Sequence, residues 1–594
     1  MCGIAGIMTP NGAPPDSDAL GRLMQALVHR GPDGQGMHVA GGTGLVHTRL
    51  AIIDLETGDQ PFLAGDGPAA ETALVANGEI YNYIELRDMV IETPPTTKSD
   101  CETPLHLYLA HGMEFADYLR GMYAVAIYDS NRDRLVLTRD PFGIKPLYYA
   151  ETDKGFVFSS EPQAMIKAGL VTAEANPQAV NQLLQLQFTT GTETAFKGVF
   201  RLLPGDTVAV EGGRIIERRR RPALPDGPPR PAANALLQLD EVLNDTIDVH
   251  QRSDVPYGMF LSGGIDSSVV LAMMARLNER PVRAFTIGFP GTKARDERDH
   301  ARAVAEAVGA EHVEVDFTED DFWSLLPAVV AATDDPAADY AILPTYKLAR
   351  TVHEHGLKVV LSGEGGDEMF GGYGRYRRAM RPRLFGGRPM RQRGMLDGLG
   401  VLRDEGADWR AGIAAVEKVE ATAGRTALQV NQAVDFADWL PNDLLIKLDR
   451  CLMAHGVEGR TPFLDPKMAN FAYLLPDRQK VRRRHGKWLL RRWLQTGLPA
   501  ADPFSRKRGF TVPVGEWMAR RGKELAPLIA ADPGISEACH PQAAGDLFKR
   551  LGSGHDNRRT KAAWVLLYYA LWHRHHIRGL PAAGDAIENL AAGG

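Results

Sequence analysis

The stretch LSGGIDSS, Leu261–Ser268, constrains the fold of this chain more than any other. It lies between an apolar run, Val255–Leu261, which predicts a buried strand, and an apolar-periodic run, Val269–Leu277, which predicts a helix. Gly263 and Gly264 allow a tight turn whose backbone N–H groups point at an anion in front of the helix. No lysine follows these glycines in the spacing of a Walker loop, so a different nucleotide chemistry is expected. The alternative is an ordinary strand–turn–helix corner, which two glycines, three hydroxyls and an acid within one turn disfavour.

A second loop of the same kind, SGEGGDE at Ser362–Glu368, follows the short run Lys358–Leu361. Strand-like and helical runs alternate through this half of the chain, for example Val282–Phe289 before the helix predicted at Arg298–Val308. This alternation predicts a parallel sheet covered by helices, and ligands of such sheets bind beyond the carboxyl ends of the strands. The two loops and Ile287 are therefore expected to converge on one site. A solvated turn is the alternative for an acidic, glycine-rich loop.

Cys2 follows Met1 directly, and removal of Met1 would leave the Cys2 thiol beside its own α-amino group. That amine titrates near neutral pH, so the thiol and the amine together can act as nucleophile and base. A cysteine buried in a strand by chance is the alternative, and a single cysteine does not decide between the two.

Four further motifs follow Cys2 in order: HRGPDGQG at 29–36, RLAIID at 49–54, NGEIYN at 77–82 and KSDCE at 98–102. Cys2 with these motifs resembles the class II glutaminase domain, a member of the N-terminal-nucleophile hydrolases. SGGIDSS resembles the pyrophosphate loop of the ATP-pyrophosphatases, which adenylate a substrate and release pyrophosphate. Together the two halves resemble the glutamine-dependent asparagine synthetases over nearly the whole chain.

The resemblance to the glutaminases implies a role for each polar residue of these motifs. Arg49 offers a forked donor to the α-carboxylate of glutamine, and Asp100 with Glu79 accepts from its α-ammonium group. The Asn77 amide and the Gly78 backbone N–H are expected to form an oxyanion hole. Taken singly, Arg49 would be a surface salt bridge and Asn77–Gly78 a hairpin turn; their order along the chain favours the catalytic interpretation. Further glutamine contacts are expected along Leu50, Ile52 and Ile53.

The resemblance to the ATP-pyrophosphatases assigns ATP to the two glycine-rich loops, and it assigns Mg²⁺ to Asp266 and Asp367 because phosphates with Mg²⁺ need hard oxygen ligands. Glu364 is expected to support formation of an acyl-adenylate. Lys507, in SRKRGF, is expected to neutralise pyrophosphate charge. Lys487, in HGKWLLRRW, is a second candidate whose helical context favours an ordinary surface lysine. The expected ATP contacts are Leu261, Ser262, Gly263, Gly264, Asp266, Ser267, Ile287, Ser362 and Gly363.

The expected architecture is an α+β N-terminal-nucleophile (αββα) glutaminase domain, followed by an α/β parallel-sheet ATP-pyrophosphatase domain with a helical C-terminal part. The predicted boundaries are residues 2–213 for the glutaminase domain, 214–232 for a linker and 233–580 for the synthetase domain. Residues 581–594, rich in alanine and glycine, are predicted to be a disordered tail.

Three segments rich in arginine or glycine carry no predicted chemistry. Glu217–Pro231, dense in proline and charge, is predicted as an extended connector after the last strand pair, Leu203–Gly213. Its arginines lack accompanying aromatic residues, and Gly371–Arg383 is predicted as a solvated helix, so no nucleic acid is expected as a partner. Gly386–Gly400 is predicted to be mobile.

The chain has 594 residues, a net charge of -6 and 4 cysteines, which implies several cores, no general attraction for polyanions and no disulfide framework. The start of the chain lacks the pattern of a signal peptide, and no apolar run is long enough to span a bilayer. A cytoplasmic protein without a membrane partner is expected. The expected partners are glutamine, ATP and an acceptor; the sequence is compatible with a homodimer but does not fix the oligomeric state.

The predicted reaction uses two sites: Cys2 releases ammonia from glutamine, and the second site adenylates a carboxylate with MgATP before ammonia displaces AMP. Aspartate is the first candidate for the acceptor. Asparagine synthetases carry threonine and arginine just ahead of the segment at Pro344, and here Ala337 and Tyr340 occupy those places. Another carboxylate, in a peptide, sugar acid or cell-surface precursor, is the alternative. A non-catalytic relative is disfavoured because the motif residues are present, and a cyclase of the β-lactam synthetase type because it lacks the cysteine nucleophile.

Overall fold

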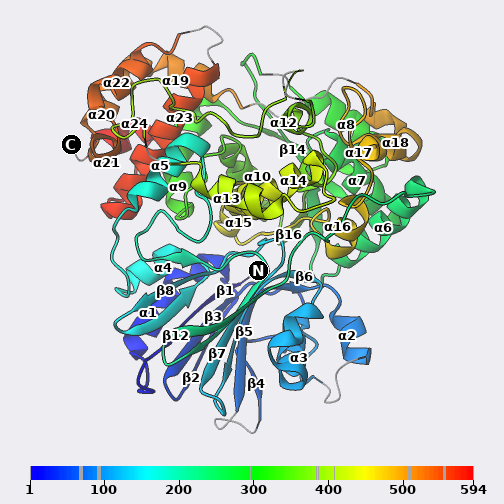
Figure 1. Ribbon diagram of the computed structural model, residues 1–594, viewed down its shortest axis with the longest axis vertical. Helices are drawn as coiled ribbons and strands as arrows, with labels where there is room; N and C mark the ends of the chain where they lie inside the picture. Colours follow the sequence, from blue (N-terminus) through cyan, green and yellow to red (C-terminus); the bar gives the residue numbers. More distant parts are fainter. Residues whose placement is uncertain are drawn as a thin grey trace.

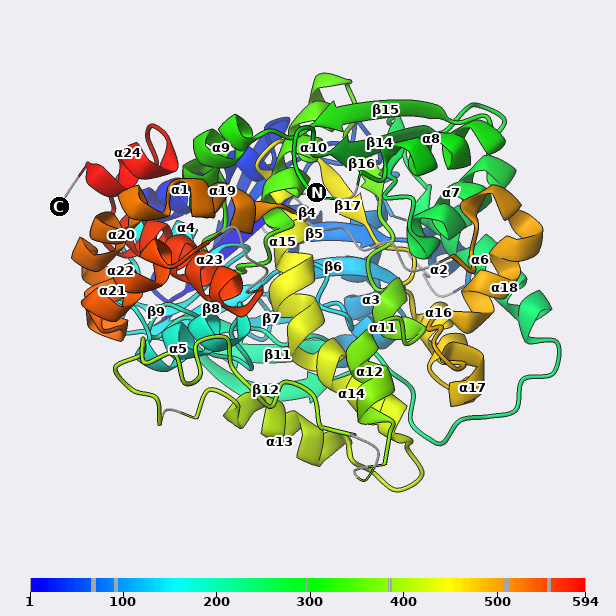
Figure 2. The same ribbon diagram turned by 90° about the horizontal axis from the view of Figure 1, so that it is seen from above.

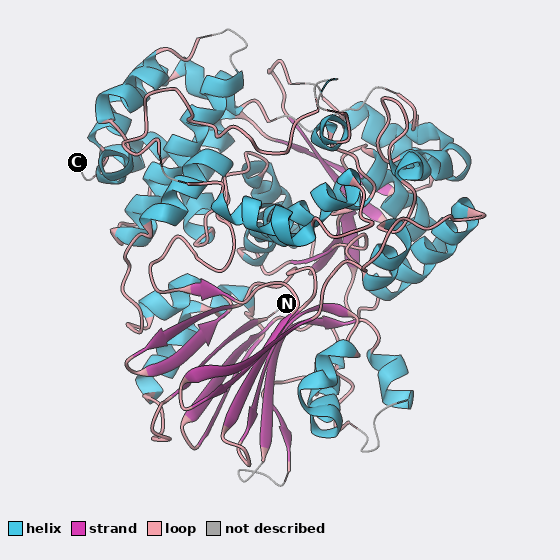
Figure 3. Ribbon diagram, viewed as in Figure 1, coloured by secondary structure: helices cyan, strands magenta, loops and turns pink. Residues whose placement is uncertain are grey.

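The computed structural model of the protein has an N-terminal part built mainly of strands and a C-terminal part built mainly of helices (Figure 1, Figure 3). In Figure 1 the N-terminus lies where the two parts meet. The structure describes residues 2–65, 71–89, 95–294, 296–382, 384, 387–406, 408–505, 512–552 and 557–592.

Two six-stranded antiparallel sheets form the N-terminal part. The first has the order β10 (Phe200–Arg201), β8 (Tyr148–Thr152), β9 (Gly155–Ser159), β1 (Gly3–Met8), β3 (Thr43–Arg49), β2 (Gly34–Ala40). The second has the order β12 (Arg214–Arg220), β11 (Asp206–Glu211), β7 (Arg134–Arg139), β6 (Gly121–Asp129), β5 (Thr72–Ile80), β4 (Phe62–Ala64).

The facing sides of these sheets share one core, in which Ile4 of the first sheet belongs to the same apolar cluster as Val75 of the second. Helix α1 (Ser17–Ala26) packs against β1 and β3, and α3 (Thr103–His111) packs against β5. The apolar residues of each strand therefore meet a partner layer on both faces. This αββα arrangement confirms the predicted fold class of the N-terminal part.

The second sheet continues further along the chain than the sequence predicted. β12 pairs with β11 through Arg220, so the interpretation of residues 214–232 as a linker is wrong for residues 214–220. Arg218 and Arg220 are two residues apart and point to the same face of the strand, where both form ion pairs with Asp206. The buried Asp206 carboxylate explains why an arginine-rich segment pairs in a sheet instead of forming a solvated connector.

The C-terminal part contains a five-stranded parallel sheet. Met259 and Ala284 of this sheet share a core with α6 (Ala235–His250), α7 (Ile265–Leu277) and α8 (Arg298–Ala307). Phe285 and Val360 belong to another core, with α10 (Ile342–Glu354). Helices therefore cover both faces, which confirms the predicted parallel sheet. Its order is β15 (Glu311–Asp316), β14 (Arg283–Gly288), β13 (Tyr257–Phe260), β16 (Val359–Leu361), β17 (Glu458–Arg460).

The chain ends in a group of helices in the C-terminal part. The last of them, α24 (Ala586–Ala591), shows that the prediction of a disordered tail is wrong for these residues. Asp585 accepts hydrogen bonds from the first turn of α24, and Ile587 and Leu590 are buried, so both capping and burial hold the helix. No helix within the described ranges has the length and apolar character needed to cross a membrane.

Residues 387–400, predicted to be mobile, are irregular but held by hydrogen bonds in the structure. The Leu396 N–H donates to the side-chain oxygen of Gln185, which belongs to the N-terminal part, at 3.0 Å. The Arg410 guanidinium donates to the backbone carbonyl of Arg391 at 3.2 Å. Both parts of the molecule therefore fix this segment, and a glycine-rich composition gave no sign of these partners.

Leu590→Ala should lower the free energy of unfolding by about 2–5 kcal/mol, because it leaves a cavity under α24. Thermal unfolding followed by circular dichroism would measure the change. Leu237→Ala is the control, since Leu237 is 65% exposed where Leu590 is 4% exposed. Equal melting temperatures for the two variants would contradict an ordered tail.

Candidate active sites

Cys2 lies directly before β1 and is buried. Its backbone N–H donates to Asn77 Oδ1 at 3.1 Å, which places the side-chain amide of Asn77 beside the cysteine. Asn77 Nδ2 is buried and has no hydrogen-bond partner among the described residues, so a donor is left for an oxygen atom of a bound molecule. Gly78 follows in β5, and a Cβ atom there would lie 2.1 Å from the Met122 carbonyl oxygen, which excludes a larger residue.

The protonation of the Cys2 thiol is set by its surroundings. Burial raises the pKa of Cys2, and the Leu50 backbone N–H acts in the opposite direction. The thiol is therefore mostly protonated at neutral pH, and its reaction as a nucleophile requires a base close to the sulfur. Of the other predicted glutamine contacts, Leu50 and Ile52 are buried and Ile53 is half-buried.

Arg49 ends β3 and is buried, not a surface side chain. Its guanidinium donates to Asp59 Oδ1 at 2.8 Å and to the backbone carbonyl of Asp54. The Asp59 side chain is 79% exposed, so water stabilises this carboxylate and a ligand carboxylate can replace it on Arg49. The arrangement fits the predicted role of Arg49 in holding a carboxylate.

Asp100 and Glu79 are both buried, and the C-terminal part contributes their neighbours. Asp100 accepts the Ile80 N–H at 2.7 Å, and burial raises the pKa of Asp100 to about 6. Arg460 of β17 pairs with Glu79 at 3.2 Å and with Glu458 at 2.6 Å. Burial and the Glu458 carboxylate raise the pKa of Glu79, because one guanidinium faces two carboxyl groups. Sequence reasoning assigned no role to Arg460 and Glu458, since their neighbours along the chain gave no sign of contact with the other part.

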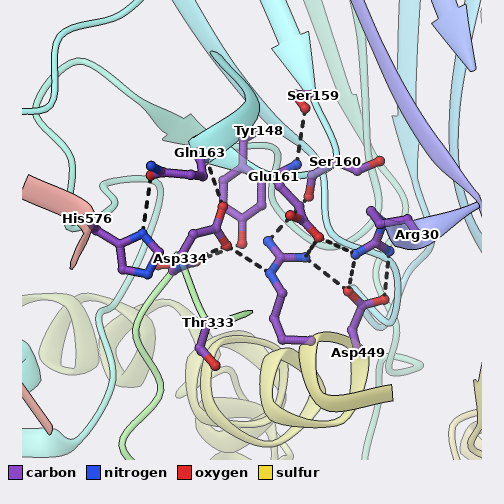
Figure 4. A network of polar contacts seen from close by, with 12 residues as sticks. Arg30, Tyr148, Ser159, Ser160, Glu161, Gln163, Thr333, Asp334, Asp449 and His576 are labelled. Carbon is purple, nitrogen blue, oxygen red and sulfur yellow. Dashed lines mark hydrogen bonds and ion pairs between the residues drawn. The ribbon is translucent and has the colours of Figure 1, made fainter. Parts of the chain in front are cut away.

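A network of buried charges joins the two parts of the molecule (Figure 4). Arg30 of this network also contacts the Cys2 backbone. Arg30 donates to the Cys2 carbonyl oxygen at 3.1 Å and to Glu161 and Asp449 at 2.8 Å each. Asp449 lies on α15 (Ile446–Met453), which packs beside α10 (Figure 2). The next residue, Arg450, contacts Glu161 at 3.5 Å. Helix α15 is therefore tied to the backbone of the cysteine through one arginine.

A pocket of about 650 Å³ lies in the C-terminal part, where the loops after β13 and β16 touch. A Cβ atom on Gly363 would lie 2.9 Å from the Ser267 nitrogen, and one on Gly366 2.6 Å from the Asp266 carboxylate. Gly263 has a φ of 65°, a backbone conformation that favours glycine. All the residues predicted to bind ATP line this pocket: Leu261, Ser262, Gly263, Gly264, Asp266, Ser267, Ile287, Ser362 and Gly363.

The interpretation of Lys487 as an ordinary surface lysine is wrong. Its side chain is 6% exposed, and its Nζ atom contacts the carboxylates of Asp266 and Asp367, the latter at 2.7 Å. A φ of 55° at the start of α18 (Trp488–Gly497) places Lys487 in a left-handed conformation instead of the regular helix. Although burial acts against it, the two carboxylates raise the pKa of Lys487. Lys507 lies outside the described residues.

Asp266 and Asp367 fit the predicted binding of Mg²⁺ in their chemistry and their position. They come from different loops and yet meet at one cation, the Lys487 ammonium group. Carboxylate oxygens are the hard ligands that Mg²⁺ prefers. The described residues contain no cluster of three metal-binding side chains, so phosphate oxygens and water would supply the remaining ligands.

Glu364 lines the same pocket, and its neighbour is a buried lysine of α15. Lys447 Nζ lies 3.4 Å from Glu364 Oε1 and 3.0 Å from Asp339 Oδ2. Sequence reasoning assigned no chemical role to Lys447, because it lies in a helical run without a turn or a glycine to mark it. Of the two positions compared for the acceptor, Tyr340 lines the pocket, whereas Ala337 is fully buried and is not a lining residue.

These geometries define a class of protein: a two-site amidotransferase with an N-terminal cysteine site of the glutaminase type and a nucleotide pocket of the ATP-pyrophosphatase type. The model of the glutamine amidotransferase domain matches residues 1–220, and the model of the asparagine synthase family matches residues 238–574. The chain belongs to the asparagine synthase family.

Relatives match along most of this chain. A putative glutamine-hydrolysing asparagine synthetase of Mycobacterium tuberculosis is 34% identical over 96% of this chain and 97% of its own length. Asparagine synthetase 1 of Bacillus subtilis is 31% identical over 97% of each chain. Asparagine synthetase B of Escherichia coli is 28% identical over 87% of this chain and 83% of its own. The protein is thus an ATP-using ligase of the glutamine-hydrolysing asparagine synthetase family.

Lys487→Met should lower ATP-dependent release of pyrophosphate by on the order of 100-fold and leave glutamine hydrolysis unchanged, because it removes the cation shared by Asp266 and Asp367. Coupled assays of pyrophosphate and glutamate would measure the two activities. Lys523→Met, at an exposed lysine, is the control. Pyrophosphate release by the Lys487 variant at the wild-type rate would contradict this placement.

Proposed function

We propose that the protein amidates a carboxylate, with aspartate as the first candidate, using ammonia from glutamine and an acyl-adenylate made with MgATP. The observation that supports this most directly is the arrangement of the two sites. The cysteine site and the nucleotide pocket lie on either side of α15, whose Asp449 and Lys447 contact residues of one site each. Contact of one helix with residues of both sites supports the transfer of ammonia from the first site to the second.

In the first half-reaction the Cys2 sulfur attacks the amide carbon of glutamine. Once Met1 is removed, the α-amino group of Cys2 takes the thiol proton. A base is needed because burial raises the pKa of the thiol. The oxyanion is stabilised by Asn77 Nδ2 and the Gly78 N–H, and the proton passes to the leaving ammonia. Water then hydrolyses the thioester to glutamate.

Arg49 and Asp100 hold the other end of glutamine in this proposal. The α-carboxylate replaces the exposed Asp59 on the Arg49 guanidinium. The α-ammonium binds Asp100, with Glu79 beside it. Leu50, Ile52 and Ile53 contact the glutamine chain between its two ends.

In the second half-reaction a carboxylate oxygen of the acceptor attacks the α-phosphorus of ATP, and pyrophosphate leaves. Mg²⁺ held by Asp266 and Asp367 would neutralise phosphate charge. Lys487, at the same two carboxylates, stabilises the charge that develops on pyrophosphate, a role first expected of Lys507. Glu364 faces the acyl-adenylate, ammonia attacks its acyl carbon, and AMP leaves.

Aspartate remains the first candidate for the acceptor because the relatives that match along the chain carry the name of asparagine synthetases. The place of the expected arginine is taken by Tyr340, which lines the pocket without a charge. A different carboxylate acceptor therefore stays as the second candidate. A screen of carboxylates for pyrophosphate release distinguishes the two.

Cys2→Ala should abolish glutamine-dependent product formation and leave ammonia-dependent product formation within about twofold, since free ammonia bypasses the first half-reaction. Amino-acid analysis of the amide product, with glutamine or ammonium chloride as nitrogen source, measures both. Cys539→Ala is the control, as Cys539 is buried among the C-terminal helices.

Two results would overturn the proposed function. Persistence of glutamine-dependent product formation in Cys2→Ala would remove the assigned nucleophile. Release of ADP and phosphate, instead of AMP and pyrophosphate, would remove the acyl-adenylate.

The KM for glutamine should rise as the pH falls below about 6, because burial raises the pKa of Asp100 to about 6. Above that pH Asp100 is an anion and binds the α-ammonium group; below it the neutral carboxyl loses this attraction. Steady-state glutaminase assays from pH 5 to 8 would measure the change. In Asp100→Asn the KM should be high at every pH, and a pH profile of KM equal to that of the wild type would refute the assignment.

A further inference from the structure

The acceptor side of the nucleotide pocket lacks the arginine expected near position 340, and this absence raises the question of which residue replaces it. Among the residues that the structure describes, six lysines and arginines line the pocket: Arg375, Arg391, Lys447, Lys487, Arg491 and Lys561. A residue that holds a ligand carboxylate needs N–H donors that the protein itself has not already used.

Four of these cations are committed to partners within the protein. Lys487 and Lys447 each contact two carboxylates. Arg491 donates to two backbone carbonyls. Arg375 directs two nitrogens at Asp435 and has its guanidinium over the rings of Tyr373 and Trp439, at 3.9 and 4.0 Å. Lys561 is exposed on α23 (Asn557–Trp572), so water already solvates its ammonium group.

Arg391 differs from these residues because only part of its guanidinium is used. Its Nη2 donates to Asp435 Oδ1 at 3.1 Å, and the guanidinium lies over the Trp439 ring at 5.1 Å. Along the described stretches of the chain, no polar atom accepts a hydrogen bond from its Nε or Nη1. These donors are not enclosed, so they remain available in the pocket that Arg391 lines.

The backbone presents Arg391 in a fixed and unusual conformation. Its φ of 50° lies in the left-handed region, which is uncommon for arginine and persists only where the surroundings hold it. The contact of Arg410 with the Arg391 carbonyl and that of Gln185 with Leu396 provide this support. The side chain is thus pre-organised before any ligand binds.

An acidic group also contacts Trp439. Asp443 is 3% exposed and lines the same pocket, and its Oδ2 accepts the Trp439 indole N–H at 2.8 Å. Its Oδ1 is buried and has no hydrogen-bond partner in the ranges that the structure describes. Burial and the nearby Asp339 carboxylate raise the pKa of Asp443 to about 8, and a ligand ammonium group would supply a donor to Oδ1 and favour the ionised carboxylate.

We propose that Arg391 binds the carboxylate of the acceptor that is not amidated, and that Asp443 binds its ammonium group, with Trp439 holding both side chains. The acceptor is then an amino acid with a second carboxylate, as in aspartate, and the second carboxylate is left to reach Glu364 and ATP. This inference rests on the proposed function, whose acceptor class it narrows. It also gives a role to the glycine- and arginine-rich segment around residue 391.

The test compares aspartate with β-alanine, which is aspartate without its α-carboxylate, in ammonia-dependent pyrophosphate release. Arg391→Met should lower kcat/KM for aspartate by about 10- to 100-fold, the value of a charged hydrogen bond, and change kcat/KM for β-alanine less than about threefold. Arg391→Lys should retain part of the preference for aspartate over β-alanine. Arg393→Met, at an exposed arginine of the same segment, should behave as the wild type.

A second arm uses succinate, which is aspartate without its ammonium group. Asp443→Asn should lower kcat/KM for aspartate and leave that for succinate within about threefold, because the amide, unlike the carboxyl group, cannot ionise to balance the ligand cation. The asparagine side chain has the shape of aspartate, so this variant keeps the pocket filled. Circular dichroism and unchanged glutaminase activity would establish that each variant is folded.

The outcomes separate the inference from the proposed function. If the wild type releases no pyrophosphate with aspartate, the acceptor assignment fails and this inference fails with it. A second outcome is that the wild type is active with aspartate while Arg391→Met lowers kcat/KM equally for aspartate and β-alanine, or for neither. In that case the proposed function stands and the assignment of Arg391 is wrong.

Discussion

The buried charges between the two parts of the molecule fix the position of the two parts and of the sites they carry. Arg30 and Glu161 come from the N-terminal part, and Asp449, Arg450 and Asp334 come from the C-terminal part. Removal of one partner from such a network leaves a charge without water or counterion, which costs about 3–5 kcal/mol. Some of these charges pair within one part, but Asp449 pairs with Arg30 and Arg450 with Glu161 across the boundary, so the network favours one relative position of the two parts. Because Arg30 also binds the Cys2 carbonyl, that position includes the cysteine.

Helix α15 transmits this constraint to the nucleotide pocket. Asp449 and Lys447 are two residues apart, and two residues of an α-helix differ by about 200° in direction. One therefore faces Arg30 and the other faces Glu364. A single helix thus contacts residues of both sites, and the relative position of the sites is set by a rigid element and not by a flexible linker. This geometry suits an intermediate that must not meet bulk water.

The features of the fold and of the two sites that depend on local sequence pattern could be predicted from the sequence. Glycine-rich turns after apolar runs marked the pocket at Gly263 and Gly363, and the order of motifs behind Cys2 marked the first site. The arginines of β12 look like a solvated connector because their partner, Asp206, lies in another strand. Lys487 looked like a surface lysine because its two carboxylates come from loops more than 100 residues away. Long-range ion pairs have no local sequence pattern, so the positions of β12 and Lys487 could not be predicted from the sequence.

The charged groups of the two sites share one property in the absence of substrate. Lys487, Lys447 and Arg49 each hold a carboxylate of the protein where a phosphate or a carboxylate of a substrate would bind. Binding at these groups exchanges one ion pair for another, so the net gain in free energy is small. Discrimination must therefore come from groups whose hydrogen-bonding capacity the protein leaves open. Asn77 Nδ2 is such a group at the first site, and Asp443 Oδ1 is such a group at the second.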